Sequence, residues 1–339
     1  MSDLIQRLGD PAAEYDALRT GAALAHATWI AALELTGKDR VDWLQGLFSN
    51  DLKRLSAGQS CYGVHLTVKG KMVADLTVLA RADSLVLITE ESTRKPLVES
   101  LDRYLIREEV EIHDHVATWD DLNVAGPDTP DDAWTTLWLR GPRAHAALEA
   151  TFGAAPALPP DAFATLGGAV CVRVAQGYDL HLPRRDAPAL AARLAPHAAP
   201  VGPDSLEVAR VEDGTPRIGA DMDENTIPLE AGLEARAISY TKGCYVGQEV
   251  IARIHSQGHV NRVLVGLLLD GDALPARGTK LRTPERELGW VTSAVHSRAL
   301  HRPIALAFVR RDHAQPGTRL SADAIGAEVH ALPFLPLPK

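Results

Sequence analysis

The residues best suited to chemistry lie in one segment, residues 242–249, which reads Lys-Gly-Cys-Tyr-Val-Gly-Gln-Glu. One helical face is expected to carry Val246, Val250, Ile251 and Ile254, and Gly258 can end that helix. Cys244 is therefore expected just before a helix start, two residues after Lys242. A helix N-terminus and a nearby cation both favour thiolate over thiol, so Cys244 is a candidate reactive thiol. The alternative is a small buried cysteine that packs against the helix.

The neighbours of Cys244 in this cysteine segment (residues 242–249) allow two interpretations each. Gly243 and Gly247 permit a close approach of the backbone to a ligand or a positive φ, or they form an ordinary tight turn. Tyr245 can stack on a planar ligand or pack in the core. The other cysteines, Cys61 and Cys171, lie in apolar strand patterns and are expected to be structural.

A long irregular stretch, residues 206–258, contains the cysteine segment and is dense in Glu, Arg, Gly and Pro. Such a stretch inside a compact protein is usually functional or disordered. The apolar residues embedded in it argue against disorder. We therefore expect a functional loop region here.

The whole chain has a globular composition and an acidic charge. Its 339 residues are 46% hydrophobic and 23% charged, which fits two or three domains. The net charge of −9 argues against nucleic-acid or membrane-surface partners, but leaves room for a small anion in a local basic pocket. Three distant cysteines, no secretory signal pattern and no long apolar run predict a cytoplasmic protein without disulfides or a metal site. No strong dimerisation face is evident, so a monomer is expected.

The order strand, helix, hairpin, helix occurs twice along the chain. The first copy is predicted at 31–37, a helix capped by Asp39, strands at 59–66, 76–80 and 84–88, and a helix at 96–106. The second is predicted at 136–141, 142–152, 169–174, 178–182 and 187–197, with the Pro- and Ala-rich stretch 154–160 on its surface. Two related α+β units explain the repeat, and coincidence is the alternative.

After about Gly258 the pattern changes to short apolar strands separated by turn residues. These strands are predicted at 263–269, 279–282, 289–295, 304–309 and 328–332. Regular spacing of this kind is typical of a small antiparallel barrel.

Several segments of the sequence resemble those of a known family. The cysteine segment resembles the signature of the YgfZ family, and the blocks at 210–214 and 227–233 resemble the wider GcvT superfamily. Residues 43–52 and 70–76 look like the N-terminal blocks of the same family. The match in order and spacing spans nearly the whole chain.

The resemblance implies an α+β fold class. Two related ferredoxin-like α+β domains and a C-terminal antiparallel β-barrel would form a ring around a central folate channel. The expected domains are 1–120, 121–258 with the cysteine segment, and 259–339.

The resemblance also implies a function. YgfZ-like proteins are tetrahydrofolate-binding accessory factors for the assembly or repair of iron–sulfur clusters, with an indirect link to tRNA modification. The expected cofactors are tetrahydrofolate or a one-carbon derivative and a transient iron–sulfur cluster. The expected partners are iron–sulfur proteins or their assembly factors. One cysteine cannot build a four-thiolate site, so a stable cluster would need ligands from a partner.

Two alternative functions stay open. One is a folate-dependent aminomethyl- or methyltransferase of the GcvT type, and the other is a plain folate-binding module. Aminomethyltransferases of the superfamily typically carry an aspartate-and-phenylalanine version of the cysteine segment. The cysteine version favours the YgfZ group.

Individual roles follow by matching positions. Glu212 is the first choice to accept two hydrogen bonds from the pterin, because it matches the R-x-E-x-G block, and Glu230 is the second. Tyr245 is a candidate to line the pterin ring. Lys242, Arg253 and Arg210 are candidates to bind the glutamate tail, each with a surface charge or structural ion pair as the alternative.

Asp75 matches the position that resembles the catalytic aspartate of the aminomethyltransferases, where it would handle a proton near folate N10. Its alternative is a hairpin aspartate that faces solvent. The predicted catalytic set is therefore Cys244, Asp75 and Lys242.

Overall fold

The computed structural model describes residues 9–114 and 133–336, and these form two compact units. Unit 1 holds residues 9–65, 74–114 and 133–205, and unit 2 holds residues 66–73 and 206–336. The chain therefore enters unit 2 once at a hairpin tip and again after residue 205. The domain boundary predicted at 120/121 lies outside the described residues, and the other predicted boundaries stay predictions.

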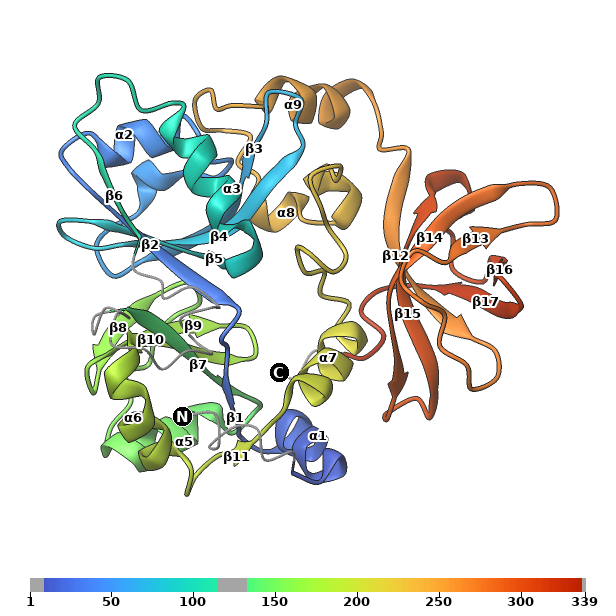
Figure 1. Ribbon diagram of the computed structural model, residues 1–339, viewed down its shortest axis with the longest axis horizontal. Helices are drawn as coiled ribbons and strands as arrows, with labels where there is room; N and C mark the ends of the chain where they lie inside the picture. The colour runs from blue at the N-terminus through green and yellow to red at the C-terminus, as the bar shows by residue number, and fades with distance from the viewer. Residues whose placement is uncertain (1–8, 115–132, 337–339) are drawn as a thin grey trace. The chain divides into compact units, whose positions relative to one another are not determined.

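The first sheet of unit 1 has five strands in the order β3-β4-β5-β2-β6 (Figure 1). They are β2 (Ile30–Thr36), β3 (Ser60–Leu66), β4 (Met72–Ala80), β5 (Leu85–Glu90) and β6 (Glu111–Asp114). Helices α2 (Arg40–Gln45) and α3 (Glu91–Asp102) and the short η2 (Leu52–Arg54) connect them. The predicted strand at 31–37 and the predicted hairpins are confirmed.

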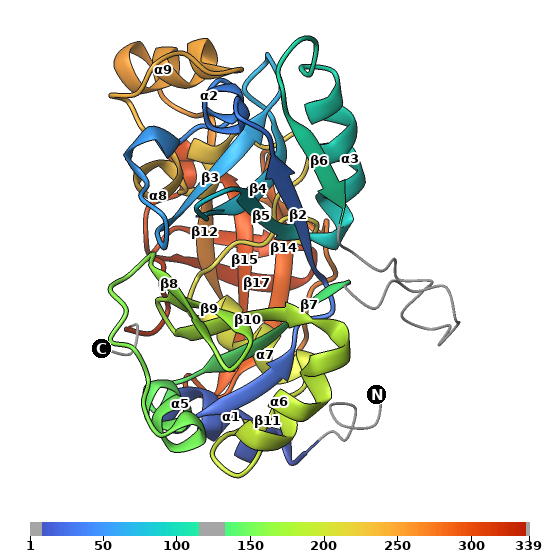
Figure 2. The same cartoon turned by 90° about the vertical axis from the view of Figure 1, so that its left-hand side faces the viewer.

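The second sheet of unit 1 has six strands in the order β11-β1-β7-β10-β9-β8. They are β1 (Ala23–His26), β7 (Trp134–Arg140), β8 (Phe163–Leu166), β9 (Ala169–Val174), β10 (Gly177–Pro183) and β11 (Ala199–Pro200). Helices α5 (Ala144–Phe152) and α6 (Ala187–Leu194) lie beside this sheet (Figure 2), while α1 (Pro11–Thr20) precedes β1 and η3 (Arg184–Asp186) precedes α6. Both sheets thus run strand, helix, three strands, helix, strand, which confirms the predicted repeat.

One strand breaks the repeat. In the second sheet β1 lies between β7 and β11, pairing antiparallel with the first and parallel with the second. The first sheet has no counterpart, because its last strand β6 pairs directly with β2. The sequence did not predict β1, since four residues of modest β propensity carry little periodic signal.

Alternating side chains of β9 divide between two hydrophobic clusters. Ala169 and Cys171 pack with α5 and α6, whereas Val170 and Val172 pack with Leu79 and Val86 of the first sheet. The period of two residues in a strand places successive side chains on opposite faces. The two sheets of unit 1 therefore share a core.

Several predicted helix boundaries were wrong. Helix α3 begins at Glu91 rather than Pro96, so its proline lies inside the helix. Asp39 precedes α2 but makes no side-chain cap, because its carboxylate accepts from the Glu109 N–H at 2.8 Å instead. Helix α6 ends at Leu194, two residues before Pro196, which disfavours helical backbone at the residue before it.

Unit 2 contains helices and a closed barrel. After α7 (Pro203–Glu212) come η4 (Pro228–Ala231), α8 (Glu234–Ala237) and α9 (Gln248–Gln257). The barrel order is β12-β15-β14-β13-β16-β17. Its strands are β12 (Arg262–Leu269), β13 (Lys280–Arg282), β14 (Glu287–Ser297), β15 (Arg302–Arg310), β16 (Arg319–Ala322) and β17 (Ile325–His330), with η5 (Arg311–His313) after β15.

The barrel has an apolar interior and an apolar patch outside. Leu267, Val291 and Ala307 belong to the interior cluster. Outside, Val211 of α7 and Phe334 near the C-terminus pack with residues of β14 and β15. The predicted fold class, two α+β units and an antiparallel barrel, is confirmed, while the ring and its channel stay predictions. Within the described residues, no helix has the length and apolar character needed to cross a membrane.

Candidate functional site

The cysteine segment forms a loop that leads into α9. Cys244 is exposed, so the alternative of a small buried cysteine is wrong. The expected helix is α9, and Gly258 ends it as predicted. It begins at Gln248, four residues after Cys244, so the expectation that Cys244 lies just before the helix start was wrong. Lys242 and Tyr245, on either side of Cys244, are buried instead. Burial of Lys242 and Tyr245 therefore holds the loop in place, while the Cys244 thiol is exposed to solvent.

Gly247 sets how closely this loop approaches the hairpin tip at 66–73. Gly247 has φ +84, and a Cβ atom there would lie 2.6 Å from the Thr67 carbonyl oxygen. Gly70 on the hairpin, with φ +69, would bring a Cβ atom to 2.9 Å from the Val250 side chain. Both positions therefore require glycine, whereas a Cβ atom on Gly243 meets nothing within 4 Å.

Lys242 and Tyr245 contact each other beneath the loop. The Lys242 Nζ lies 5.1 Å from the centre of the Tyr245 ring, a cation–π distance. Burial raises the pKa of the Tyr245 hydroxyl to about 12, so it is neutral at physiological pH. In this structure Tyr245 acts as a core residue of the loop, and its predicted contact with a ligand stays a prediction.

A cluster of polar side chains, which the sequence did not predict, joins α8 to α9. The Tyr240 hydroxyl donates to Glu234 Oε1 at 2.6 Å, and His255 Nδ1 lies 2.7 Å from the same oxygen. The two rings stack with centroids 3.9 Å apart. The hydrogen bond from Tyr240 is the main reason that the pKa of Glu234 is lowered. These contacts fix both ends of the stretch that carries Cys244.

Glu212 ends α7 and is fully buried against the barrel. The Ser297 hydroxyl, at the end of β14, donates to Glu212 Oε1 at 2.6 Å. The backbone carbonyl of Glu212 accepts from the Phe334 N–H at 2.9 Å. Burying a carboxylate costs free energy unless hydrogen-bond donors surround it. Glu212 therefore needs donors such as the Ser297 hydroxyl.

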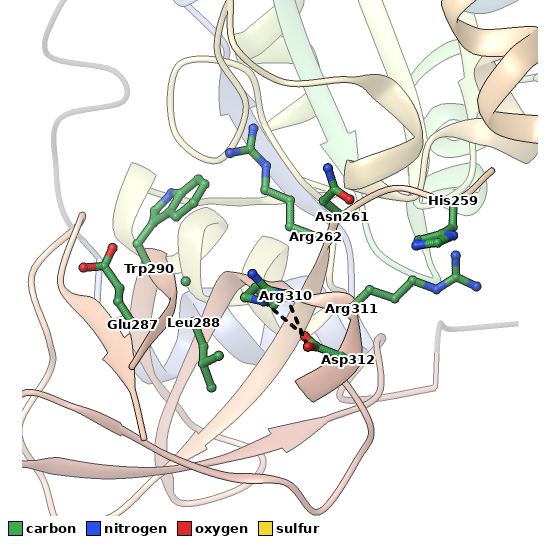
Figure 3. A pocket seen from close by; sticks show the side chains of 10 residues that line it. His259, Asn261, Arg262, Glu287, Leu288, Trp290, Arg310, Arg311 and Asp312 are labelled. Atoms are coloured by element: carbon green, nitrogen blue, oxygen red, sulfur yellow. Dashed lines mark hydrogen bonds and ion pairs between the residues drawn. The ribbon is translucent and has the colours of Figure 1, made fainter. Parts of the chain in front are cut away.

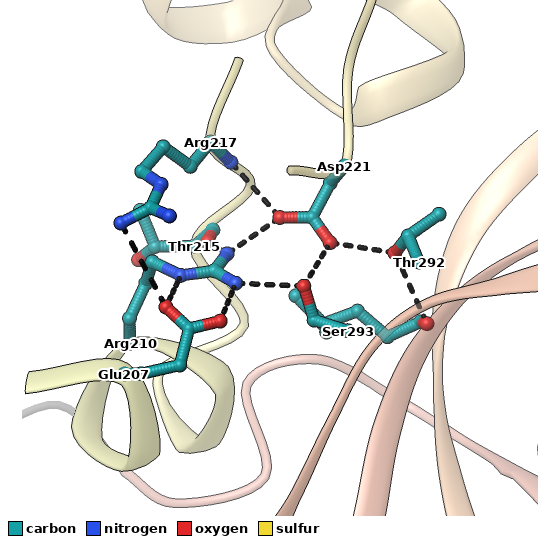
Figure 4. A network of polar contacts seen from close by, with 8 residues as sticks. Glu207, Arg210, Thr215, Arg217, Asp221, Thr292 and Ser293 are labelled. Atoms are coloured by element: carbon teal, nitrogen blue, oxygen red, sulfur yellow. Dashed lines mark hydrogen bonds and ion pairs between the residues drawn. The ribbon is translucent and has the colours of Figure 1, made fainter. Parts of the chain in front are cut away.

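Arg210, two residues earlier on α7, lies at the centre of a buried network (Figure 4). Its guanidinium donates to Glu207 at 2.9 Å, Asp221 at 2.5 Å and Ser293 at 2.8 Å. Asp221 also accepts from the Thr292 and Ser293 hydroxyls of β14. These contacts join α7 to the barrel and favour the structural ion pair over the predicted role of Arg210 in binding a glutamate tail.

Glu230 in η4 is also buried and paired. Its Oε2 accepts from the Ile227 N–H at 3.0 Å and from Arg262 Nη2 at 3.1 Å. Arg262 begins β12 and lies over the Trp290 ring at 4.7 Å. Sequence reasoning missed Arg262, because nothing local to it indicates a partner 32 residues earlier. Arg253, the remaining candidate, is exposed on α9.

Asp75 belongs to unit 1, on β4. The Tyr62 hydroxyl donates to Asp75 Oδ2 at 2.9 Å across the β3–β4 hairpin, and the side chain is half-buried. The Asp75 backbone carbonyl accepts from the Thr89 hydroxyl at 2.7 Å. The carboxylate is thus oriented by a tyrosine, a partner that the sequence alone did not indicate.

The chain matches the models of two domain families. The GCVT N-terminal domain matches residues 9–131, and the glycine cleavage T-protein C-terminal barrel domain matches residues 262–336. Together the two matches span more than half of the chain.

Similar proteins and a similar solved structure cover nearly its full length. An aminomethyltransferase of Rubrobacter xylanophilus is 28% identical over 307 residues, covering 88% of this chain and 78% of that protein. An aminomethyltransferase of Streptomyces coelicolor is 29% identical, covering 98% and 91%. The crystal structure of glycine cleavage system aminomethyltransferase T from Bartonella henselae has a TM-score of 0.84 at 22% identity, covering 96% and 90%, and shares the fold.

Proposed function

This chain belongs to the GcvT/aminomethyltransferase superfamily, and from this premise we propose that it binds tetrahydrofolate or a one-carbon derivative of it. The observation that carries the proposal is the likeness to aminomethyltransferases, which extends over nearly the whole chain. The proposed activity is the transfer of an aminomethyl or methyl group to or from the folate. The names of the relatives support this activity better than an iron–sulfur role.

Glu212 is the proposed pterin acceptor. A pterin presents a 2-amino group and a ring N–H side by side, and one carboxylate can accept from both. Glu212 is fully buried and its Oε1 accepts from the Ser297 hydroxyl, so a pterin would bind the carboxylate through its remaining lone pairs. The glutamate tail would be bound by exposed cations, for which Arg253 is better suited than the fully engaged Arg210.

Calorimetric titration with tetrahydrofolate and its methylene and formyl forms tests this proposal. Glu212→Gln is expected to weaken binding by roughly tenfold or more, because one of the two accepting oxygens becomes a donor. Asp204→Asn, an exposed carboxylate in the first turn of the same helix, is the matched control and should bind as the wild type does. Failure of the wild-type protein to bind any folate form would refute the proposal.

Asp75 is the proposed proton-handling group of the transfer. Its carboxylate is oriented by Tyr62, as a general acid–base group requires. With a lipoyl-bound aminomethyl donor or an N-methylated donor, Asp75→Asn is expected to lower turnover by about 10²- to 10⁴-fold. Tyr62→Phe, which keeps the ring and removes the hydrogen bond, should lower it less. Folate binding without turnover of any such donor would rule out the transferase.

One observation favours a second candidate, an accessory factor for iron–sulfur cluster assembly or repair. Cys244 is exposed in a loop that the fold holds at both ends, and aminomethyltransferases typically lack a cysteine there. The thiol would act on a transient cluster or on an iron–sulfur partner protein. In cells that lack the wild-type protein, Cys244→Ala should then fail to restore iron–sulfur enzyme activities, whereas Cys61→Ala should restore them. Full restoration by Cys244→Ala would remove this candidate.

A further inference from the structure

Positive charge is concentrated at one end of the barrel, where β12 begins and β15 ends. These strands are antiparallel neighbours, and Arg262 lies directly opposite Arg310. Arg311 follows at once, and its backbone N–H donates to the Asn261 carbonyl at 3.0 Å. Like charges directly opposite each other destabilise a sheet. The paired Arg262 and Arg310, with Arg311 next to them at the start of η5, therefore need compensation.

Two of the three arginines are compensated within the protein. Arg262 pairs with Glu230 at 3.1 Å and also donates to the Asn225 carbonyl. Arg310 contacts Asp312 at 3.3 Å. Arg311 differs, because its exposed guanidinium makes no hydrogen bond or ion pair with any residue that the structure describes. The Arg311 guanidinium is thus available to bind a ligand.

A pocket opens at the same place, with a volume of about 960 Å³ (Figure 3). This size is within the range of small-molecule sites. Arg311 extends toward His259 on one side, while Trp290 and Leu288 of β14 lie on the other. The pocket thus combines a free guanidinium, an imidazole and an apolar wall.

The two carboxylates of the pocket do not cancel its positive charge. Glu287 pairs with Lys280 at 2.8 Å, and Asp312 contacts both Arg286 and Arg310. The pocket is therefore cationic on a chain whose net charge is −9. Such a local reversal of sign attracts a small anion and gives no general affinity for polyanions.

We propose that this pocket is a binding site for a small molecule that carries a phosphate or carboxylate group. The guanidinium of Arg311 would take the oxyanion through its planar pair of N–H donors, with Arg310 and the side chains of His259 and Asn261 beside it. The apolar wall of Leu288 and Trp290 would contact the rest of the ligand.

This site is distinct from the proposed folate acceptor. Leu288 to Trp290 lie near the start of β14, whereas Ser297, the partner of Glu212, ends it. At about 3.3 Å per residue the two ends are roughly 25 Å apart. The proposed anion site therefore does not depend on Glu212 as the pterin acceptor.

Titration calorimetry of the full chain at low ionic strength tests the proposal, with pyrophosphate and a γ-linked triglutamate peptide as probes. At least one probe should bind the wild-type protein, and Arg311→Gln should weaken that binding by tenfold or more. Arg277→Gln, an exposed arginine on the turn between β12 and β13, is the control and should bind within twofold of the wild type. Binding should also weaken as salt is added.

The outcomes are distinct. Pyrophosphate binding alone identifies a phosphate ligand, and peptide binding alone identifies a carboxylate ligand. Arg311 is exposed, so its variant should melt at the wild-type temperature, and a melting curve checks this. Absence of binding by both probes at millimolar concentration, or equal binding by the wild type and Arg311→Gln, would overturn the proposal.

Discussion

At the scale of single residues, burial decides what the thiols of this protein can do. Cys244 is exposed, whereas burial raises the pKa of Cys171 to about 12. Because the thiolate is the reactive form, iodoacetamide should alkylate Cys244 in the native protein and reach Cys171 only after denaturation. Peptide mass spectrometry before and after adding urea measures both. Labelling of Cys171 as fast as Cys244 in the native state would contradict this assignment.

His181 of β10 makes stability depend on pH. Burial lowers its pKa from 6.5 to about 4, and its Nδ1 lies 2.8 Å from the Thr136 hydroxyl. Above pH 6.5 the ring is neutral in both the folded and unfolded chain. Between pH 6.5 and about 4 only the unfolded chain takes up the proton, so folding becomes less favourable as pH falls, by about 3 kcal/mol in all.

Denaturant unfolding at pH 7 and pH 4.5 checks this prediction with a His181→Gln variant. The variant should lose less stability between the two pH values than the wild type does. The buried His65, whose pKa is also lowered by burial, remains in both proteins and contributes equally. The same loss in both proteins would show that His181 is not the group responsible.

At the scale of elements, glycine chemistry holds the cysteine segment against the hairpin tip. Gly247→Ala places a Cβ atom 2.6 Å from the Thr67 carbonyl at a positive φ, so we expect a loss of about 1–3 kcal/mol in the free energy of unfolding. Gly243→Ala, in the same segment, meets nothing within 4 Å and should change it by less than about 0.5 kcal/mol. Urea titration measures both. Equal stability of the two variants would mean that the close approach at Gly247 is unimportant.

The same segment shows what could be predicted from the sequence. Helix α9 and its end at Gly258 were predictable, because apolar spacing and a terminal glycine are local signals. The contact between Glu212 and Ser297 was not, since the partners are 85 residues apart and no local pattern links them. Arg210 was assigned to a ligand for the same reason. Its partners Asp221 and Ser293 meet it only when α7 packs on β14.

At the scale of the whole molecule, unit 2 is assembled from two separate parts of the chain. The hairpin tip reaches it through the Met72 N–H, which donates to the Thr226 carbonyl at 3.0 Å, and through Lys71, which donates to the Asn225 carbonyl at 2.6 Å. The six barrel strands, in contrast, all come from residues 262–330 and enclose their own core. The loops before the barrel therefore depend on contacts with the hairpin tip, whereas the barrel is stabilised by its own core.

A fragment of residues 206–336 tests this difference. We expect the barrel to form, and we expect the amides of 225–257 to exchange hydrogen faster than in the full chain, because the hairpin tip is missing. Hydrogen exchange read by mass spectrometry compares the two proteins, with the amides of β14 and β15 as the internal control. Unchanged exchange at 225–257 would show that the hairpin tip does not stabilise these loops.

The position of β1 in its sheet determines when this strand can pair during synthesis of the chain. β1 ends at His26, but its partners β7 and β11 end at Arg140 and Pro200, so about 170 residues separate it from the last of them. At about 5–20 residues per second a ribosome needs roughly ten to thirty seconds to supply them. Until β7 is made, both edges of β1 lack their partner strands, and one edge lacks its partner until β11 is made. A nascent chain stalled before residue 134 therefore offers an unpaired strand to its neighbours on the same messenger, which is where association between growing copies would begin.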